Sequence, residues 1–257
     1  MRTDFVTATQ ATHGEPSEEG GSQAVKVQLK LREMVLAGDL QAGSRITELA
    51  LVEKLGVSRT PIRAALIRLE QEGLLQQMPS GGFAVRKFSE ADVADAIELR
   101  GTVEGLAARM AAERGTSEEE LARANHCLDE IDLLLRESVL HEEAFSRYVD
   151  LNAQFHALLG AFAASPVVLR ELERVGSLPF ASPSGFVGVQ ANSPKARDML
   201  IVAQDQHRQV MQAIAQREGA RAEALMREHS RLAQRNLREA VRSPLYLPGA
   251  HLISPSS

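Results

Sequence analysis

The hydrophobic positions of the N-terminal third repeat mainly at the helical spacing of three and four residues. The clearest stretch is Ser58–Glu72, where four apolar residues form one stripe and Pro61 falls in the first turn, as expected for a helix. A short helix is predicted over Thr47–Leu55, with Thr47 as its N-cap. Val25–Ala37 alternates like a strand at first and then takes helical spacing, and its helix-forming residues favour a helix.

A strand pair with a glycine-rich tip is predicted next in the chain. Leu75–Met78 and Phe83–Arg86 flank Pro79-Ser80-Gly81-Gly82, which is typical of a β-hairpin. The order helix, short helix, tight turn, helix and hairpin predicts a winged helix-turn-helix domain, which we assign to residues 23–88. Residues 1–22 are rich in Thr, Ser, Glu and Gly and are expected to form a disordered tail.

From Ser89 onward the pattern is almost entirely helical. Acidic residues close behind Ser89 and Ser117 predict capped helix starts at both positions. The predicted helices cover about 89–114, 117–139, 142–164, 166–176, 194–216 and 219–241. The fold class is therefore mainly α, with an all-α bundle of six to seven helices over 89–242 and a loose tail at 243–257. The loop at 177–193 is rich in Pro, Ser and Gly yet also apolar, so it is expected to pack as a lid.

The composition excludes several classes of protein. The chain is 44% hydrophobic and 25% charged, so its 257 residues can bury a core, but it has no Trp and only two Tyr. Few aromatic rings argue against a stacking platform for single-stranded nucleic acid. No apolar run of about 18 residues and no signal peptide occur, so we expect a cytoplasmic protein with no membrane partner. A single cysteine excludes an intramolecular disulfide.

The charge is unevenly distributed along the chain. Residues 23–88 hold ten Lys and Arg against six Asp and Glu, a net charge of +4, although the whole chain carries −5. A basic N-terminal block on an acidic body indicates two domains with different partners. Within the basic block, Arg59 and Arg63 are four residues apart on one face of the predicted helix, where a guanidinium can read guanine in the major groove. The alternative is that they only solvate the helix.

Three strings favour the DNA-binding interpretation: GDLQAGSRI (38–46), LGVSRTPIR (55–63) and LEQEGL (69–74). Together they resemble the GntR family of bacterial transcriptional regulators over about sixty residues. The resemblance implies that double-stranded operator DNA is contacted by residues of the recognition helix, namely Ser58, Arg59, Thr60 and Arg63. It further implies a wing tip against the minor groove, formed by Ser80, Gly81 and Gly82, and one further contact from Arg45.

Four polar residues of the helical part are candidates for a metal site. Asn152 and His156 are one turn apart on a helix, and His207 and His229 lie on the last two helices. Neutral imidazoles with one oxygen ligand would suit Zn²⁺ or Ni²⁺. Taken singly, each histidine is better explained as a hydrogen-bonded core residue or a solvated one than as a metal ligand, and spacing on separate helices does not establish convergence.

The helical part resembles the FCD class, named for the FadR C-terminal domain, through Glu98-Leu99-Arg100 and Val103-Glu104 in its first helix. Many members carry a D/N-x3-H pair and two later histidines that bind a metal in the bundle centre. Asn152, His156, His207 and His229 match this pattern residue by residue. Asn152 stands in place of the commoner Asp, which removes one negative charge from the metal site.

The FCD resemblance implies a ligand-responsive regulator rather than an enzyme. An open metal position would hold a small carboxylate effector, and Arg100 could pair with that carboxylate, although an ordinary ion pair with Glu104 explains it equally well. A homodimer is expected to read a pseudo-palindromic operator, and the effector would release it. Whole-chain similarity points to regulators of aromatic-acid catabolism, the vanillate-operon type included. Two alternatives stay open, namely a metalloenzyme and a helical domain that only dimerises.

Overall fold

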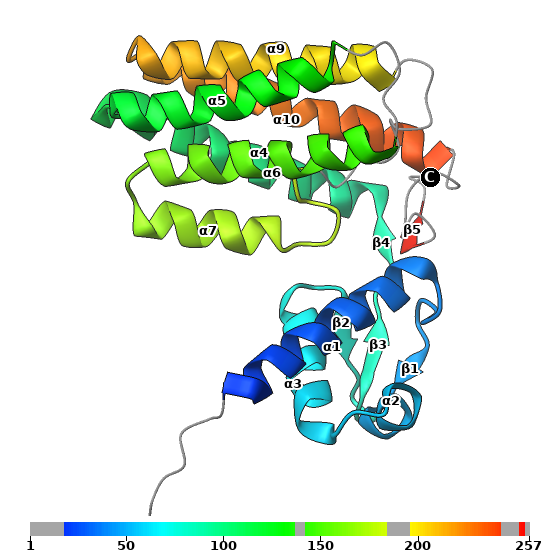
Figure 1. Cartoon of the computed structure of the whole chain (residues 1–257). Helices are drawn as coiled ribbons and strands as arrows, with labels where there is room; N and C mark the ends of the chain where they lie inside the picture. The colour runs from blue at the N-terminus through cyan, green and yellow to red at the C-terminus, as the bar shows by residue number, and fades with distance from the viewer. Residues whose placement is uncertain (1–17, 137–141, 184–195, 243–251, 255–257) are drawn as a thin grey trace, which may run out of the picture.

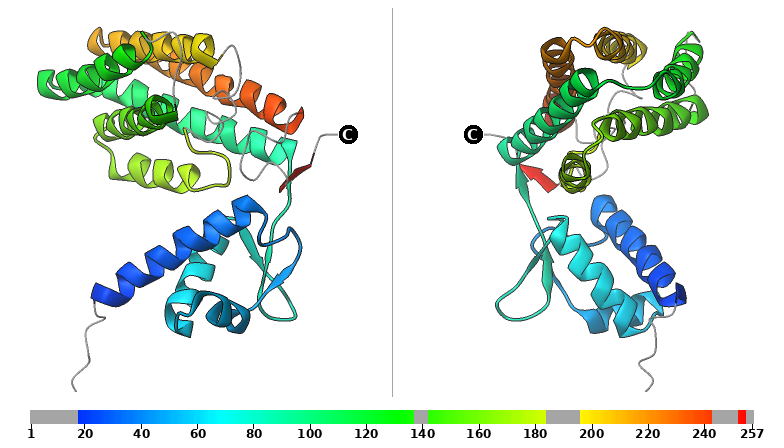
Figure 2. Two further views of the ribbon diagram at one scale, coloured as in Figure 1. Left: turned by 45° about the vertical axis from the view of Figure 1, so that its right-hand side comes forward. Right: turned by 90° about the vertical axis from the view of Figure 1, so that its left-hand side faces the viewer.

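The computed structural model describes residues 18–136, 142–183, 196–242 and 252–254 and arranges them in two domains (Figure 1). A small domain of helices and short strands lies below a bundle of long helices. Strand β4 (Phe88–Ser89) runs between them in every view (Figures 1 and 2). The order of elements confirms the mainly α fold, with a winged helix-turn-helix followed by a helical bundle.

The small domain is built on three helices, α1 (Glu18–Ala37), α2 (Glu48–Leu55) and α3 (Arg59–Gln71). Thr47 caps α2 as predicted, because its side chain accepts a hydrogen bond from the amide three residues on. Gly56 ends α2 in the left-handed conformation with φ 65°. The apolar stripe of α3 is fully buried and consists of Ile62, Ala65, Leu66 and Leu69.

Three short strands complete the small domain in the order β1 (Arg45–Ile46), β3 (Phe83–Val85), β2 (Leu75–Gln77), all antiparallel. β2 and β3 form the predicted hairpin. β1 was not predicted, because two residues give no alternating pattern. Gly82 has φ 84°, and a Cβ there would lie 2.8 Å from the Ile46 carbonyl oxygen, so only glycine lets the hairpin tip approach β1.

The bundle contains α4 (Glu90–Arg114), α5 (Glu118–Leu134), α6 (Glu142–Phe162), α7 (Pro166–Gly176), α9 (Ala196–Ala215) and α10 (Gly219–Arg242). The predicted capped starts are present, since Ser89 with Asp92 and Ser117 with Glu120 each form a capping box. α5 ends at Leu134, five residues before its predicted end.

α4 and α10 pack closely along the bundle because α4 carries two glycines one turn apart. A Cβ at Gly101 would lie 2.1 Å from the Ser230 hydroxyl oxygen, and one at Gly105 would lie 2.9 Å from Cγ of Arg227. Larger residues at either position would push the helices apart. The spacing of polar side chains carried by α4 and α10 therefore depends on these glycines.

The two domains share a hydrophobic core around the linker, which is strand β4. β4 (Phe88–Ser89) pairs in parallel with β5 (Ile253–Ser254), and Leu252 is fully buried beside them. The Phe180 ring packs edge-on against Phe88, with 5.7 Å between ring centroids. The same cluster includes Ile97 of α4 and Leu237 of α10 together with the core of the small domain. Both α4 and α10 are therefore packed into the same core as the small domain.

Both predicted tails were wrong in part. α1 begins at Glu18, so the last five residues of the predicted tail 1–22 are helical. Leu252–Ser254, within the predicted loose tail 243–257, are buried or paired with the linker. The remaining residues of both tails lie outside the described part of the chain. No helix among the described residues is long and apolar enough to cross a membrane.

The predicted lid is described only up to Pro183. Ala181 in this segment is fully buried, and Phe180 adopts φ 64°, a left-handed backbone that is costly for a bulky residue. The packing of the Phe180 ring against Phe88 of the linker stabilises this backbone. Residues 184–193 of the predicted loop lie outside the described residues.

Candidate DNA-binding surface and buried histidine cluster

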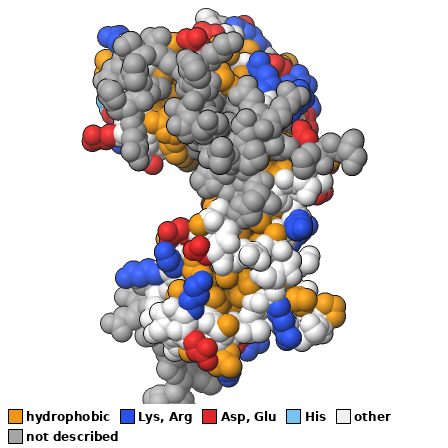
Figure 3. All heavy atoms as spheres, turned by 90° about the vertical axis from the view of Figure 1, so that its right-hand side faces the viewer, with side chains coloured by type: hydrophobic (Ala, Val, Ile, Leu, Met, Phe, Trp, Pro, Cys, Tyr) orange, Lys and Arg blue, Asp and Glu red, His pale blue; other side chains and the backbone are white. Residues whose placement is uncertain are grey.

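The four candidate residues of the recognition helix lie together at the start of α3. Ser58 precedes the first turn, and its side chain forms no cap hydrogen bond to the helix. Arg59 and Thr60 are exposed, as is Arg63, whose Nε lies 3.8 Å from a carboxylate oxygen of Glu48. An exposed ion pair at this distance contributes little stability, so Arg63 is available to a ligand. Figure 3 shows Lys and Arg side chains in separate groups over the small domain.

The wing residues and Arg45 form a second group. Arg45 Nη2 donates a 2.9 Å hydrogen bond to the Ser80 carbonyl oxygen, which ties β1 to the hairpin tip. Ser80 and Gly81 are exposed, and Gly81 and Gly82 both have positive φ. The structure thus brings Arg45 to the wing rather than to α3. No pattern in the sequence predicts that contact, because it depends on the unpredicted strand β1.

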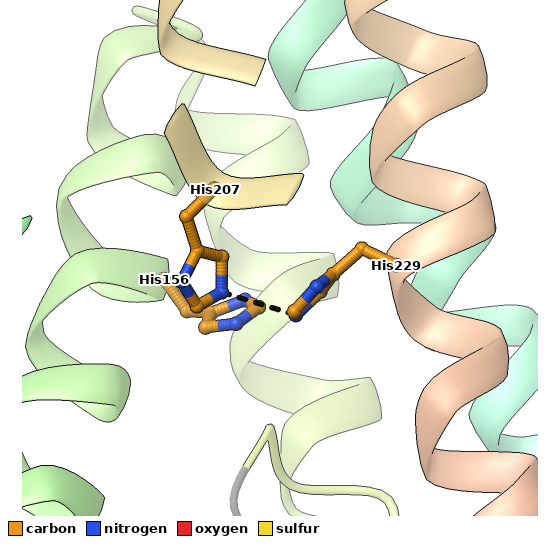
Figure 4. Close-up of side chains that lie close together, drawn as sticks. All are labelled: His156, His207 and His229. Atoms are coloured by element: carbon orange, nitrogen blue, oxygen red, sulfur yellow. Dashed lines mark hydrogen bonds between the residues drawn. The ribbon is translucent and has the colours of Figure 1, made fainter. Parts of the chain in front are cut away.

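Three histidines converge in the centre of the bundle (Figure 4). His156 on α6, His207 on α9 and His229 on α10 are all buried, and one ring nitrogen from each lies within 4.8 Å of the others. The Nε2 atoms of His207 and His229 are 3.1 Å apart. The predicted set of histidines is therefore brought together by three helices.

Each histidine has a side-chain oxygen beside its Nδ1 atom. Glu104 Oε1 lies 2.8 Å from Nδ1 of His156, Gln204 Oε1 lies 3.3 Å from that of His207, and Gln206 Oε1 lies 3.2 Å from that of His229. Gln204 is itself oriented, because its amide nitrogen donates to the Leu128 carbonyl and to Asp132. Oxygen acceptors at Nδ1 place the proton there and leave Nε2 for a ligand bond.

The free Nε2 positions fit a metal ion. His156 Nε2 is buried and has no hydrogen-bond partner among the described residues. With the proton of each ring on Nδ1, the Nε2 lone pairs of His207 and His229 face each other at 3.1 Å, and a cation bound to both would remove their repulsion. Neutral imidazoles whose Nδ1 atoms are hydrogen-bonded are the usual ligands of Zn²⁺ and Ni²⁺.

Burial keeps His207 and His229 neutral. Burial lowers the pKa of His207 and His229 well below the usual value, and the neighbouring His156 lowers both further. For Glu104 burial acts to raise the pKa, but Arg100 and His156 outweigh it and hold the pKa below the usual value. Glu104 is therefore a carboxylate, and its Oε1 accepts a hydrogen bond from Nδ1 of His156.

Arg100 and Asn152 line a cavity beside the histidines. The cavity has a volume of about 30 Å³ and is also bounded by His229, Tyr148 and Asn236. Arg100 Nη1 lies 3.5 Å from Glu104 Oε2, so the predicted intrahelical pair is present, but Arg100 Nε and Nη1 make no hydrogen bond among the described residues. Both explanations of Arg100 thus have support, since it faces the acid and the cavity.

Four residues of this site were missed as functional candidates: Glu104, Gln204, Gln206 and Asn236. For Glu104 the sequence holds an indication of such a role, because it follows the candidate Arg100 by one turn on a helix that faces the core. Outside the cluster, His126 is exposed and pairs with Glu130, as expected for a surface residue. His141 lies outside the described residues.

Family models match both domains. The model of the bacterial regulatory proteins of the gntR family matches residues 23–85, and the FCD domain model matches residues 95–232. A transcriptional regulator of the helix-turn-helix type from an unstable DNA locus of Streptomyces ambofaciens is 32% identical over 80% of each chain. The helix-turn-helix transcriptional repressor GlaR of Escherichia coli is 28% identical, over 77% of this chain and 88% of the repressor.

Solved structures show the same fold. Escherichia coli McbR/YncC superposes with a TM-score of 0.60 at 18% identity, covering 84% of this chain and 97% of the other. A GntR regulator from a Rhodococcus species gives a TM-score of 0.56 at 20% identity, over 85% and 99% of the two chains. The chain belongs to the GntR family of bacterial regulators and carries an FCD domain. It is a DNA-binding transcriptional regulator and not an enzyme.

Proposed function

We propose that this regulator is a repressor that binds a pseudo-palindromic operator as a homodimer and is released by a small carboxylate. The carboxylate would bind a divalent transition metal, Zn²⁺ or Ni²⁺, held by His156, His207 and His229 with Asn152 as the oxygen ligand. DNA would be read by Ser58, Arg59, Thr60 and Arg63, with Arg45 and the wing tip, Ser80-Gly81-Gly82, on the adjacent backbone. Relatives named as repressors support the direction of control.

One observation carries the proposal for the pocket. Six buried side-chain nitrogen and oxygen atoms lack a hydrogen bond in the described part of the chain, and five of them belong to Arg100, Glu104, His156 and Asn236. Unsatisfied buried polar atoms cost about 1–3 kcal/mol each, so their concentration at one place points to a polar ligand. A metal would satisfy His156, and an anionic oxygen would satisfy Arg100.

The chemistry of the metal site follows from its residues. The metal would supply positive charge that binds a carboxylate oxygen, while Glu104, Gln204 and Gln206 hold the three imidazoles in the tautomer that presents Nε2. Arg100 would take the second carboxylate oxygen. Asn152 contributes an amide oxygen and no charge, so the bound ion keeps more positive charge for the effector.

Release of DNA would follow from the shared core. Asn236 borders the cavity, and the next residue, Leu237, belongs to the hydrophobic cluster that joins the bundle to the small domain. A ligand that spreads α4 and α10 therefore displaces the linker strand β4 and changes the spacing of the two recognition helices in a dimer. Operator affinity depends on that spacing.

Fluorescence anisotropy with a labelled operator tests the proposal. The metal-loaded protein is expected to bind the operator in the absence of acid and to dissociate on addition of small carboxylates. Operator binding that no carboxylate changes, with or without metal, would favour a helical domain that only dimerises. The expected similarity to aromatic-acid regulators stays a prediction, which benzoate-type acids test in the same assay.

A further inference from the structure

One buried polar atom of the cavity is left over after the proposed metal and carboxylate are placed. His156 Nε2 faces the metal position, and the Arg100 donors face the carboxylate, but Asn236 Oδ1 is an acceptor with no hydrogen bond among the described residues. Asn236 is 4% exposed and lines the cavity. A buried amide oxygen in a cavity is a site for a ligand donor.

Asn236 lies on the same face of α10 as the metal ligand. His229, Leu232, Ala233 and Asn236 follow the spacing i, i+3, i+4, i+7, and all four line the cavity. Seven residues of helix span about 10 Å along its axis. The cavity therefore has one end at His229, with Arg100 nearby, and another end at Asn236.

The donor that Asn236 would meet is a hydroxyl rather than an ammonium group. The site already holds the positively charged Arg100 guanidinium, which lines the same cavity, and the proposed metal would add more positive charge. A second ligand cation would be repelled, while a neutral hydroxyl would not be. The Asn236 amide also carries both an acceptor and a donor, which suits a hydroxyl, since that group acts as either.

We infer that Asn236 determines specificity in this pocket by binding a hydroxyl group of the effector, so that the effector class is hydroxy-carboxylic acids. The inference rests on the proposed function, because it takes the carboxylate end as given. The cavity holds room for about two water molecules. A carboxylate and a hydroxyl of one small acid can replace such waters and satisfy the polar atoms at both ends.

Isothermal titration of the metal-loaded full-length protein with matched acids tests the inference. The probes are propanoate, 2-hydroxypropanoate, 3-hydroxypropanoate and alanine, together with benzoate and its three monohydroxy derivatives. At least one hydroxy acid is expected to bind about tenfold to a hundredfold more tightly than its parent acid, while alanine gains nothing. Asn236→Leu is expected to remove that preference, so that each hydroxy acid binds no more tightly than its parent acid.

Two further variants control for structure. Gln234→Leu removes another amide of α10, which reaches Ala94 and Glu98 and does not line the cavity, so the hydroxyl preference is expected to persist. Asn236→Ser keeps a hydrogen-bonding group in case the leucine variant fails to fold, and it is expected to retain part of the preference. Melting temperatures of all variants report on folding.

The outcomes separate the two proposals. Acids that bind without any hydroxyl preference, or a preference that survives in Asn236→Leu, overturn the role of Asn236 and leave the carboxylate pocket standing. Equal gains for alanine and the hydroxy acids overturn the choice of a hydroxyl. Failure of every acid in the panel to bind overturns both the hydroxyl inference and the proposed carboxylate pocket.

Discussion

The two functional regions of this regulator differ in how their residues are brought together. The residues proposed to contact DNA from the recognition helix lie within six consecutive positions, are exposed, and owe their arrangement to one helix start: Ser58, Arg59, Thr60 and Arg63. The histidine cluster is fully internal and is assembled by α6, α9 and α10, with Glu104 contributed by α4. A local motif thus makes the surface for DNA, whereas tertiary packing makes the pocket.

Breaking the surface region should have the largest effect. We expect Arg59→Ala and Arg63→Ala each to weaken specific operator binding by about 1–3 kcal/mol if both guanidinium groups read bases, and the double variant to approach the sum. The melting temperature should stay unchanged, because both side chains are exposed. Anisotropy titrations at several salt concentrations measure the affinity.

The matched control for this prediction is Arg231→Ala, which removes an exposed arginine of α10 that forms an ion pair with Glu228 one turn earlier. Its operator affinity should equal that of the wild type. Wild-type affinity in the Arg59 and Arg63 variants would remove the assignment of α3 as the recognition helix.

Breaking the joint between the regions comes next. Deletion of residues 252–257 removes β5 and the buried side chains of Leu252 and Ile253. Because the burial of two aliphatic side chains is lost, the free energy of unfolding should fall by about 3 kcal/mol. Urea denaturation measures this loss, and the exposed-residue variant Ser254→Ala should show none. Equal stability of the truncated protein would mean that the C-terminal strand does not support the linker.

Removal of the proposed metal ion tests the pocket. If metal binds only the folded protein, a metal concentration 100 times the dissociation constant adds about 2.7 kcal/mol of stability. A chelator should therefore lower the melting temperature of the wild type, and His207→Ala or His229→Ala should abolish that sensitivity. His126→Ala, on the exposed face of α5, should keep it. A chelator without effect on the wild type would contradict a bound ion.

Acid is expected to destabilise the chelated protein through its two buried histidines. The pKa of His207 and of His229 lies well below the usual value of 6.5 in the folded state. Below pH 6.5 these two histidines therefore bind protons in the unfolded chain but not in the folded chain. The free energy of unfolding then falls by about 1.4 kcal/mol per pH unit for each histidine. Replacement of both by leucine should flatten this fall, whereas His126→Leu should not. An unchanged slope in the double variant would show that other groups cause the acid sensitivity.

The sequence predicted the local features well and the assembled ones only in part. The recognition helix, its start at Ser58 and the hairpin followed from apolar spacing, capping residues and glycines, all of which act within a few positions. Strand β1 was missed because two residues carry no periodic signal. It holds Arg45 at the wing.

Convergence of the histidines could be predicted only through resemblance to a family, because spacing along separate helices does not fix how those helices pack. Gln204 and Asn236 show the same limit. By pattern each is an ordinary polar residue. Only the folded structure shows Gln204 bonded to Asp132 and Asn236 beside the cavity. Leu252 and Ile253 lie in a tail rich in Pro and Ser, where two adjacent apolar residues give no period.

Elemental analysis combined with operator release tests the central claim of a metal-dependent carboxylate switch most directly. Protein purified without a histidine tag is expected to contain about one equivalent of a transition metal per chain, and small carboxylates should release it from the operator. In His207→Ala the metal and the release should both be lost, while operator binding without acid survives. Less than about a tenth of an equivalent of any transition metal, with release by acids intact, would contradict the account and leave the histidines as direct ligand contacts or core residues.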